Sequence, residues 1–417
     1  MRQILYLFLF VIPTALYSQQ DFGLKVVKEL CSKEYCGRGY VNDGHVKAAD
    51  YINRRFEEFG LSKFNNNYFQ YFNIKANTFP DSVSLFVEGS KLETGIDYLI
   101  SSVSGSAKGV FNLKFINRNN IIEFLEDLNN RNIRFDGNAF VLDDAEISDN
   151  DTLQLFRELA MIIAQKSPVF KINDAKFTWS VGTEQMPFPI VEIKSEKLPK
   201  STRNVKINIH NVFKSTIKTQ NVIAYVEGRK KTKFIVISAH YDHLGQMGND
   251  VYFPGANDNA SGIAMLLYLS KYFSKNKPKY SLVFMAFGAE EVGILGSKYY
   301  VENPLFPLND IRFVINCDIM GTGDQGVTVV NGTVHKKEFK KLAVLNLKKK
   351  YVNKVKVRGR AANSDHYWFS QRQIPAVFIY TLGGITAYHD VFDKSETLPL
   401  TEFSDLSKLL IGFVNSF

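Results

Sequence analysis

The chain has 417 residues, of which 45% are hydrophobic and 22% are charged. This composition excludes a disordered or collagen-like protein, and the length favours two or three domains. The formal net charge is +9, yet nine Lys and two Arg stand against one Glu between His335 and Arg360. The basicity is therefore one local feature, which favours a solvated helix face over a nucleic-acid surface.

Residues 1–18 have the pattern of a secretory signal peptide. Arg2 gives a positive start, residues 4–12 are an apolar run too short to span a bilayer, and a small-residue stretch ends at Ser18. The alternative is an N-terminal anchor that is kept. We expect cleavage near Ser18 and a secreted or periplasmic protein with no membrane span after signal removal.

Residues 19–80 and 81–215 differ in their patterns. The first segment has helical apolar spacing between about 21 and 62 and predicts the N-terminal part of a catalytic domain. The second has one helical stretch at 152–166 among short β-like runs at 83–87, 110–116, 139–142, 189–193 and 205–209. It has no cluster of candidate catalytic residues, so we expect an inserted, mainly β domain.

The three cysteines are too few for a disulfide framework. Cys31 and Cys36 are close enough in sequence to bridge in an oxidising compartment, which would leave Cys317 unpaired. Three separate core thiols are an equal alternative.

Strands and helices alternate in residues 216–417. The predicted strands are 234–238, 281–287, 311–317, 327–330 and 376–380, and the predicted helices are 260–274, 336–350 and 402–415. Apolar runs separated by helices predict an α/β fold with a mostly parallel or mixed sheet sandwiched by helices.

Imidazole and carboxylate side chains follow four of these strands. In chain order the candidates are His240, Asp242, Asp258, Glu290, Glu291, Asp318 and His389. Ligands bind at the carboxyl ends of strands in such sheets, so these side chains are expected to converge. Collected acids would repel one another without a cation, and mixed His and carboxylate ligands suit zinc, with manganese or cobalt as alternatives.

Five motifs resemble the M28 family of co-catalytic zinc aminopeptidases. They are His240-x-Asp242, Gly255-Ala-Asn-Asp258-Asn-Ala-Ser-Gly, Glu290-Glu291, Asn316-x-Asp318 and Tyr388-His389, in the order of that family. The likeness covers about 216–417, and a weaker one covers 30–62 around Cys36-Gly37-Arg38-Gly39. The middle segment loosely resembles the protease-associated insert of many members.

The resemblance implies two zinc ions. One would be held by His240 and Asp318 and the other by Glu291 and His389, with Asp258 bridging them. Residues 216–417 would then be a di-zinc peptidase domain.

The resemblance also implies roles for residues that hold no metal. Glu290 would be the general base and Tyr388 would hydrogen-bond the substrate carbonyl. Asp242 can orient the imidazole of His240 from behind. Asp365, in Ser364-Asp365-His366, has two interpretations, a place in the substrate pocket or the start of a helix.

The predicted function is a secreted di-zinc metallopeptidase, an aminopeptidase that releases N-terminal residues through a metal-bridging hydroxide. Its substrate would be a peptide or protein, with no nucleic-acid partner, and the oligomeric state is left open. The alternatives are a glutaminyl cyclase of the same fold and a metal-free, non-catalytic homologue.

Overall fold

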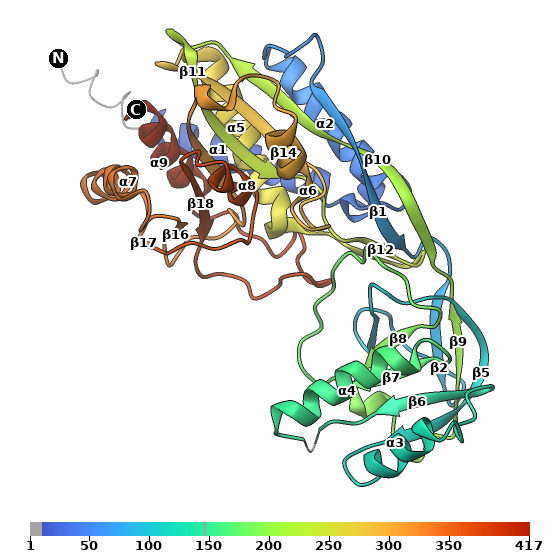
Figure 1. Cartoon of the computed structure of the whole chain (residues 1–417). Helices are drawn as coiled ribbons and strands as arrows, with labels where there is room; N and C mark the ends of the chain where they lie inside the picture. The colour runs from blue at the N-terminus through green and yellow to red at the C-terminus, as the bar shows by residue number, and fades with distance from the viewer. Residues whose placement is uncertain (1–10, 146) are drawn as a thin grey trace, which may run out of the picture.

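The computed structural model describes residues 11–145 and 147–417. Residues 1–10 of the predicted signal peptide lie outside this part of the chain, so cleavage near Ser18 stays a prediction. Figure 1 shows two lobes, each built around its own sheet. The upper lobe contains the N-terminal helices and the C-terminal half of the chain, and the lower lobe contains the segment between them.

The upper lobe is built on an eight-stranded sheet in the order β1-β10-β14-β11-β15-β18-β16-β17. Its strands are β1 (Phe69–Thr78), β10 (Val212–Val226), β11 (Lys230–His240), β14 (Tyr280–Phe287), β15 (Ile311–Cys317), β16 (Val327–Val330), β17 (Val355–Val357) and β18 (Ala376–Thr381). The central strands β14, β11, β15 and β18 are parallel, whereas β10 and β16 run antiparallel to their central neighbours. The sheet is therefore mixed around a parallel core.

Helices cover both faces of this sheet. They are α1 (Val11–Leu30), α2 (Gly44–Glu58), α5 (Ser261–Lys275), α6 (Leu295–Glu302), α7 (Lys336–Lys349), α8 (His366–Gln371) and α9 (Phe403–Asn415), with a short 3-10 helix η1 (Lys33–Arg38). Alternate residues of β11 face opposite cores, because successive strand side chains point to opposite faces. Ile235 and Ile237 pack with α1, α2, α5 and α9, and Val236 packs with α6 and α8.

The lower lobe contains a second eight-stranded sheet in the order β3-β2-β9-β5-β6-β7-β8-β4. Its strands are β2 (Val83–Val87), β3 (Ser90–Lys91), β4 (Tyr98–Ile100), β5 (Ala107–Ile116), β6 (Asn138–Leu142), β7 (Val169–Ile172), β8 (Ile190–Ile193) and β9 (Asn204–Ile209). Strands β5 to β8 are parallel, and α3 (Ile121–Asn129) and α4 (Asn150–Ile163) pack on one face. Helix α3 was not predicted, because nine residues are too few to show a clear helical period.

The chain passes between the lobes at two adjacent points. It leaves the upper sheet after Thr78 and returns at Val212, and these two residues pair in the ladder of β1 and β10. The ends of the lower segment thus lie side by side, as an insertion requires. We keep the domain division at residues 81 and 215 as a proposal.

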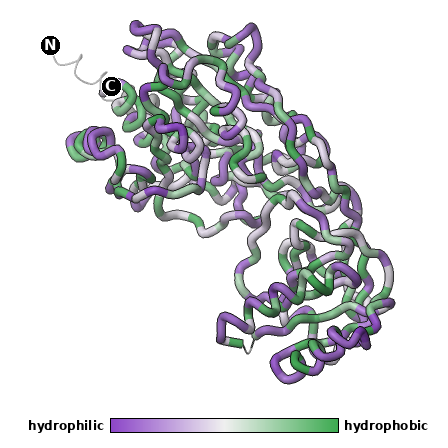
Figure 2. The backbone as a smooth tube through the Cα atoms, viewed as in Figure 1, coloured by the Kyte–Doolittle hydropathy of each residue, from purple (hydrophilic) through white to green (hydrophobic). Residues whose placement is uncertain are grey.

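Three further expectations concern the whole chain. The three cysteines are free and buried. The possible disulfide between Cys31 and Cys36 is therefore absent from the structure, and the alternative of three separate core thiols is confirmed. Helix α7, which carries much of the basic segment, is largely hydrophilic in Figure 2, and only Leu342 and Asn346 of this helix are buried. Among the described residues, no helix is both long and apolar enough to cross a membrane.

Candidate metal centre

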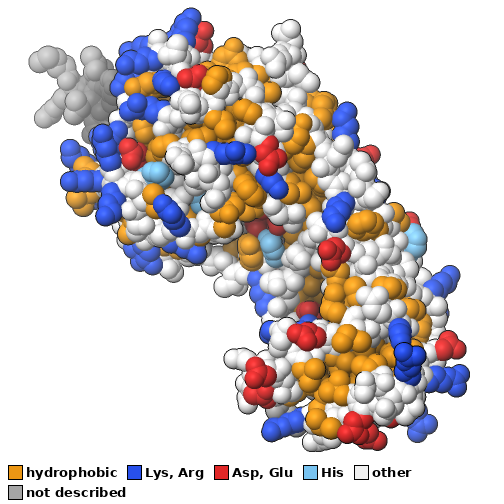
Figure 3. Space-filling model, viewed as in Figure 1, with side chains coloured by type: hydrophobic (Ala, Val, Ile, Leu, Met, Phe, Trp, Pro, Cys, Tyr) orange, Lys and Arg blue, Asp and Glu red, His pale blue; other side chains and the backbone are white. Residues whose placement is uncertain are grey.

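Three neighbouring parallel strands end at one edge of the upper sheet with polar side chains. β11 ends at His240, β14 is followed closely by Glu290 and Glu291, and β15 is followed directly by Asp318. His240 is 1% exposed and Asp318 is 5% exposed. In Figure 3, histidine and acidic side chains lie together in the hollow between the two lobes. These side chains therefore lie at one edge of the sheet, as their positions at strand ends predicted.

Asp258 lies between two histidines. Its Oδ1 is 3.3 Å from His240 Nε2 and its Oδ2 is 3.1 Å from His389 Nε2. Asp318 Oδ1 is 3.4 Å from that nitrogen of His240, and Glu291 Oε2 is 3.3 Å from that of His389. The five side chains thus form two groups that share Asp258. We name them the strand half (His240 and Asp318) and the loop half (Glu291 and His389).

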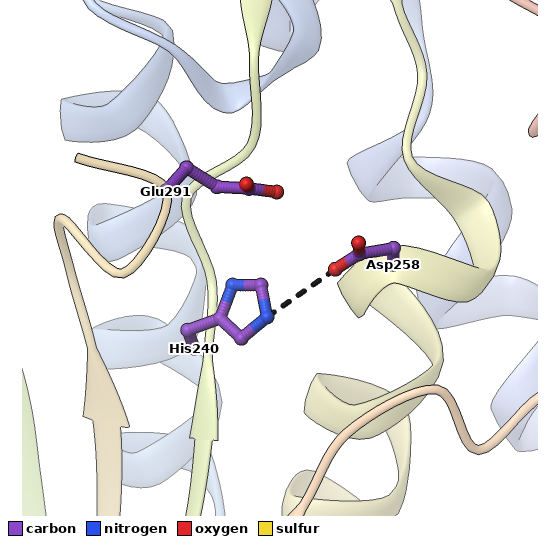
Figure 4. A group of neighbouring side chains, drawn as sticks. All are labelled: His240, Asp258 and Glu291. Atoms are coloured by element: carbon purple, nitrogen blue, oxygen red, sulfur yellow. Dashed lines mark ion pairs between the residues drawn. The ribbon is translucent and has the colours of Figure 1, made fainter. Parts of the chain in front are cut away.

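Figure 4 shows three of these side chains converging on one space. His240, Asp258 and Glu291 each place one ligand atom within 4.8 Å of the others. They come from the end of a strand, from the short, distorted helix η3 (Ala256–Ala260) before α5 and from the turn after β14. Residues up to 51 positions apart in sequence meet here only because the sheet aligns their elements.

Both histidines present the same ring nitrogen to the carboxylates. Nδ1 of His240 is 3.2 Å from the carbonyl oxygen of Asp242, and Nδ1 of His389 is 3.0 Å from that of Trp179. A carbonyl oxygen only accepts, so Nδ1 carries a proton, and Nε2 is the nitrogen that a metal ion would take. Metal-bound histidines are oriented in this way, and the residues present fit zinc.

The ligand carboxylates are held by neighbouring side chains. In the strand half, Ser364 Oγ donates to Asp318 Oδ2 at 2.8 Å and accepts from Asn316 Nδ2 at 2.7 Å. In the loop half, His243 Nδ1 is 2.7 Å from Glu291 Oε1. His243 was not predicted as a site residue, although it stands in the same strand-end run as His240.

Asp242 differs from its predicted place. Its carboxylate is 3.9 Å from His240 Nδ1, and its backbone carbonyl takes the hydrogen bond instead. The carboxylate oxygens accept from the backbone N–H groups of Glu290 at 3.0 Å and Glu291 at 3.3 Å, and from Tyr40 at 3.1 Å. Asp242 thus fixes the turn after β14, because its carboxylate accepts from two successive backbone N–H groups of that turn.

The loop that carries Asp258 is held by two residues that were not predicted. Asp393 accepts from the backbone N–H groups of Asn257 at 2.8 Å and Asp258 at 3.0 Å. Arg38 is fully buried and donates to carbonyl oxygens before and within this loop, including Gly255 at 2.7 Å. Arg38 belongs to the segment that weakly resembled the family, but sequence alone did not show what it contacts.

Excess negative charge shifts the pKa values of the site. Burial raises the pKa of Glu290 well above its usual value, and the nearby charges of Glu291, Asp365 and Asp318 add to this, against the opposing effect of His240. Burial alone would lower the pKa of His389, but Glu291 and Asp258 outweigh it and raise that pKa to about 11. Glu290 and His389 hold their protons tightly because the site carries excess negative charge, and a divalent cation would offset that charge.

A cavity of about 310 Å³ opens beside the two halves. Glu290 and Tyr388 line it, and the ring of Tyr388 stacks on that of His389 with centroids 4.0 Å apart. Asp365 is absent from the lining and fully buried, so its expected place in the pocket is corrected. It directly precedes α8, which agrees with the second interpretation, the start of a helix.

Three residues next to or within the site have left-handed backbone conformations. The φ angles are 58° at Ala289, 55° at Ile319 and 53° at His389. Such angles are costly for residues other than glycine and cluster at functional sites. The turns after β14, β15 and β18 therefore carry strain where they position Glu290, Asp318 and Tyr388.

Two imidazoles and three carboxylates, buried at the edge of an α/β sheet beside a cavity, define a site of the metallohydrolase class. Residues 221–414 match the family model of Peptidase family M28. This part of the chain is an M28 peptidase domain.

Two relatives, a metalloprotease and an aminopeptidase, match this chain over part of their length. A probable zinc metalloprotease of Pyricularia oryzae is 35% identical over 115 residues, which are 26% of this chain and 23% of that protein. Aminopeptidase YwaD of Bacillus subtilis is 28% identical over 150 residues, which are 35% and 31% of the two chains. The chain thus spans less than a third of the length of either relative.

Solved structures share the fold over nearly the whole chain. A zinc aminopeptidase from Bacillus subtilis superposes with a TM-score of 0.70 at 18% identity, covering 95% of this chain and 94% of that one. A peptidase M28 precursor from Shewanella amazonensis gives 0.69 at 14% identity, covering 97% and 95%. The predicted zinc-aminopeptidase-like α/β fold is confirmed. The likeness of the lower lobe to a protease-associated domain stays a prediction.

Proposed function

We propose that the protein is a secreted aminopeptidase that uses two zinc ions. The observation that carries this is Asp258, whose two oxygens face different histidines at 3.3 and 3.1 Å. One carboxylate placed so can bridge two cations, with one ion in the strand half and one in the loop half. Manganese or cobalt could replace zinc with the same donor set.

Bound zinc would polarise the scissile carbonyl and lower the pKa of water toward about 7. Glu290 lines the cavity beside both halves, so its carboxylate can accept a proton from the attacking water and return it to the leaving amine. Tyr388 also lines the cavity, and its hydroxyl can donate to the carbonyl oxygen as negative charge develops there.

The aminopeptidase assignment rests on the named relatives and on the size of the cavity. About 310 Å³ suits one or two residues of a substrate better than a long peptide. The relatives named above include an aminopeptidase and a metalloprotease.

Hydrolysis of aminoacyl-4-nitroanilides and of N-blocked peptides, with and without a chelator, tests the proposal. We expect metal-dependent release from free amino termini only. Equal turnover of blocked peptides would exclude an aminopeptidase, and cyclisation of a peptide with N-terminal glutamine would favour the cyclase alternative. No turnover of any peptide with zinc present would support the non-catalytic alternative.

A further inference from the structure

A segment of the lower lobe reaches into the loop half of the metal centre. Residues 173–189 connect β7 to β8, and in Figure 1 the chain in this region rises from the lower lobe toward the upper one. The backbone N–H of Trp179 donates to the carbonyl of His389 at 2.8 Å, and the carbonyl of Trp179 lies 3.0 Å from His389 Nδ1. One residue of the insert therefore contacts both the backbone and the ring of a predicted zinc ligand.

Lys176 makes a second set of contacts from the same segment. Its Nζ donates to the carbonyl oxygens of Thr386 at 2.7 Å and Tyr388 at 3.2 Å. It also forms an ion pair of 2.8 Å with Asp390, whose side chain is only 5% exposed. A single ammonium thus joins three points of the loop on either side of His389.

Asp390 transmits this contact to the backbone of the loop. Its oxygens accept from the backbone N–H of Tyr388 at 3.4 Å and of Phe392 at 2.9 Å. A carboxylate buried to this degree needs a cation or several donors to offset its lost hydration. Lys176 is the cation that the structure places there, so its loss is expected to disturb the loop.

The segment is itself fixed to the lower lobe. The indole Nε1 of Trp179 donates to the carbonyl oxygen of Ile100 in β4 at 2.8 Å, whereas its ring stacks on Phe253, outside the inserted segment, with centroids 4.7 Å apart. Lys194 donates to the carbonyl of Asn173 at 3.1 Å. Residues 173–189 are therefore held at both the sheet of the insert and the metal centre.

We propose that the lower lobe positions the loop half of the metal centre, with Lys176 and the backbone of Trp179 as its positioning residues. Trp179 fixes the ring of His389 with Nε2 toward the site, and Lys176 fixes the loop that carries Tyr388. The proposal rests on the metal site proposed above, and it gives the insert a role in zinc binding and turnover.

Three lysine variants test the proposal. Lys176→Met removes the ammonium and keeps the aliphatic stem, and Lys176→Arg keeps the charge. Lys197→Met is a matched control, because Lys197 pairs at 3.3 Å with Asp97 in the same lobe, with side chains 37% and 16% exposed. Zinc affinity is measured by competition with a chelator, together with kcat, KM and the thermal midpoint of the zinc-free proteins.

For Lys176→Met we expect affinity for one zinc ion and kcat each to fall about tenfold, while KM and the zinc-free midpoint stay close to those of the wild type. Lys176→Arg should recover most of both losses, and Lys197→Met should behave as wild type. Equal zinc affinity and kcat in Lys176→Met and Lys197→Met would overturn the proposal. The failure of the proposed function is a separate result, because zinc affinity is measured whether or not peptides are hydrolysed.

Discussion

The strand half and the loop half of the metal centre are built in different ways. His240 and Asp318 sit at the ends of neighbouring parallel strands, and Ser238, Asn316 and Ser364 hydrogen-bond in series behind Asp318. Glu291 and His389 stand in turns and depend on more distant contacts. The side chain of His240 is 2% exposed and that of His389 is 17% exposed.

The two halves therefore show two ways in which a fold can position metal-binding side chains. Strand register fixes the strand half, because parallel strands end at the same edge whatever their loops do. The loop half is fixed by His243 and by a segment that belongs to the other lobe. Disturbances outside the upper sheet should therefore affect the loop half first.

The largest effect is expected at the group that serves both halves. Glu290→Gln keeps the shape of the side chain but removes the base, so kcat should fall by about 10²–10⁴ while both zinc ions remain bound. Steady-state kinetics and zinc analysis of the same sample measure the two quantities. Glu302→Gln, at an exposed position at the end of α6, is the control. Wild-type turnover by Glu290→Gln would remove Glu290 from its assigned role.

The two halves should lose zinc independently. His243→Leu removes the partner of Glu291 Oε1 and should lower the zinc affinity of the loop half about 10–100-fold. Ser364→Ala removes the donor to Asp318 and should lower the zinc affinity of the strand half by no more than about tenfold. Calorimetric titration of zinc-free protein separates the two sites. If both variants weakened the same site, the division into halves would be wrong.

Asp365 is expected to affect the stability of the zinc-free protein and not its turnover, because it shares the charge environment of the strand half. Burial raises its pKa from 3.8 to about 7. The folded protein therefore keeps this proton up to about pH 7, whereas the unfolded chain releases it near 3.8. The contribution of this group to the free energy of unfolding is therefore lost as the pH rises through that window.

Asp365→Asn removes this titration. We expect the zinc-free variant to be more stable than the wild type by up to about 4 kcal/mol near pH 8 and nearly equal to it near pH 4. Urea unfolding at both pH values measures the difference. A wild type and variant that lose the same stability between these pH values would contradict the raised pKa.

The predictable part of the site follows from strand ends and local motifs. His240, Glu290, Glu291 and Asp318 follow apolar strands directly, so the sheet alone brings them together. Helix and strand positions were also predictable where apolar runs were long, as in β15, whose bounds match the predicted 311–317. The resemblance to the family added His389 and Tyr388.

The rest could not be predicted, because it depends on contacts without a sequence pattern. Trp179 acts through its backbone, and any residue type offers the same carbonyl. Nothing in the sequence around Lys176 or Asp393 distinguishes them from other charged residues. Only the fold shows that Lys176 pairs with Asp390 and that Asp393 accepts from the backbone of Asp258. The sequence correctly placed Asp242 next to His240. It could not show that the backbone carbonyl of Asp242, and not its carboxylate, accepts from His240, because this depends on the conformation of the turn.

The proposed function requires Asp258 to lie between two metal ions. Crystals grown with excess zinc, measured at the zinc absorption edge, give the positions of bound ions directly from anomalous differences. We predict two peaks about 3.5–4 Å apart on either side of Asp258, one beside His240 and Asp318 and one beside Glu291 and His389. A single peak at saturating zinc, or two peaks that do not share Asp258, would contradict the proposed function.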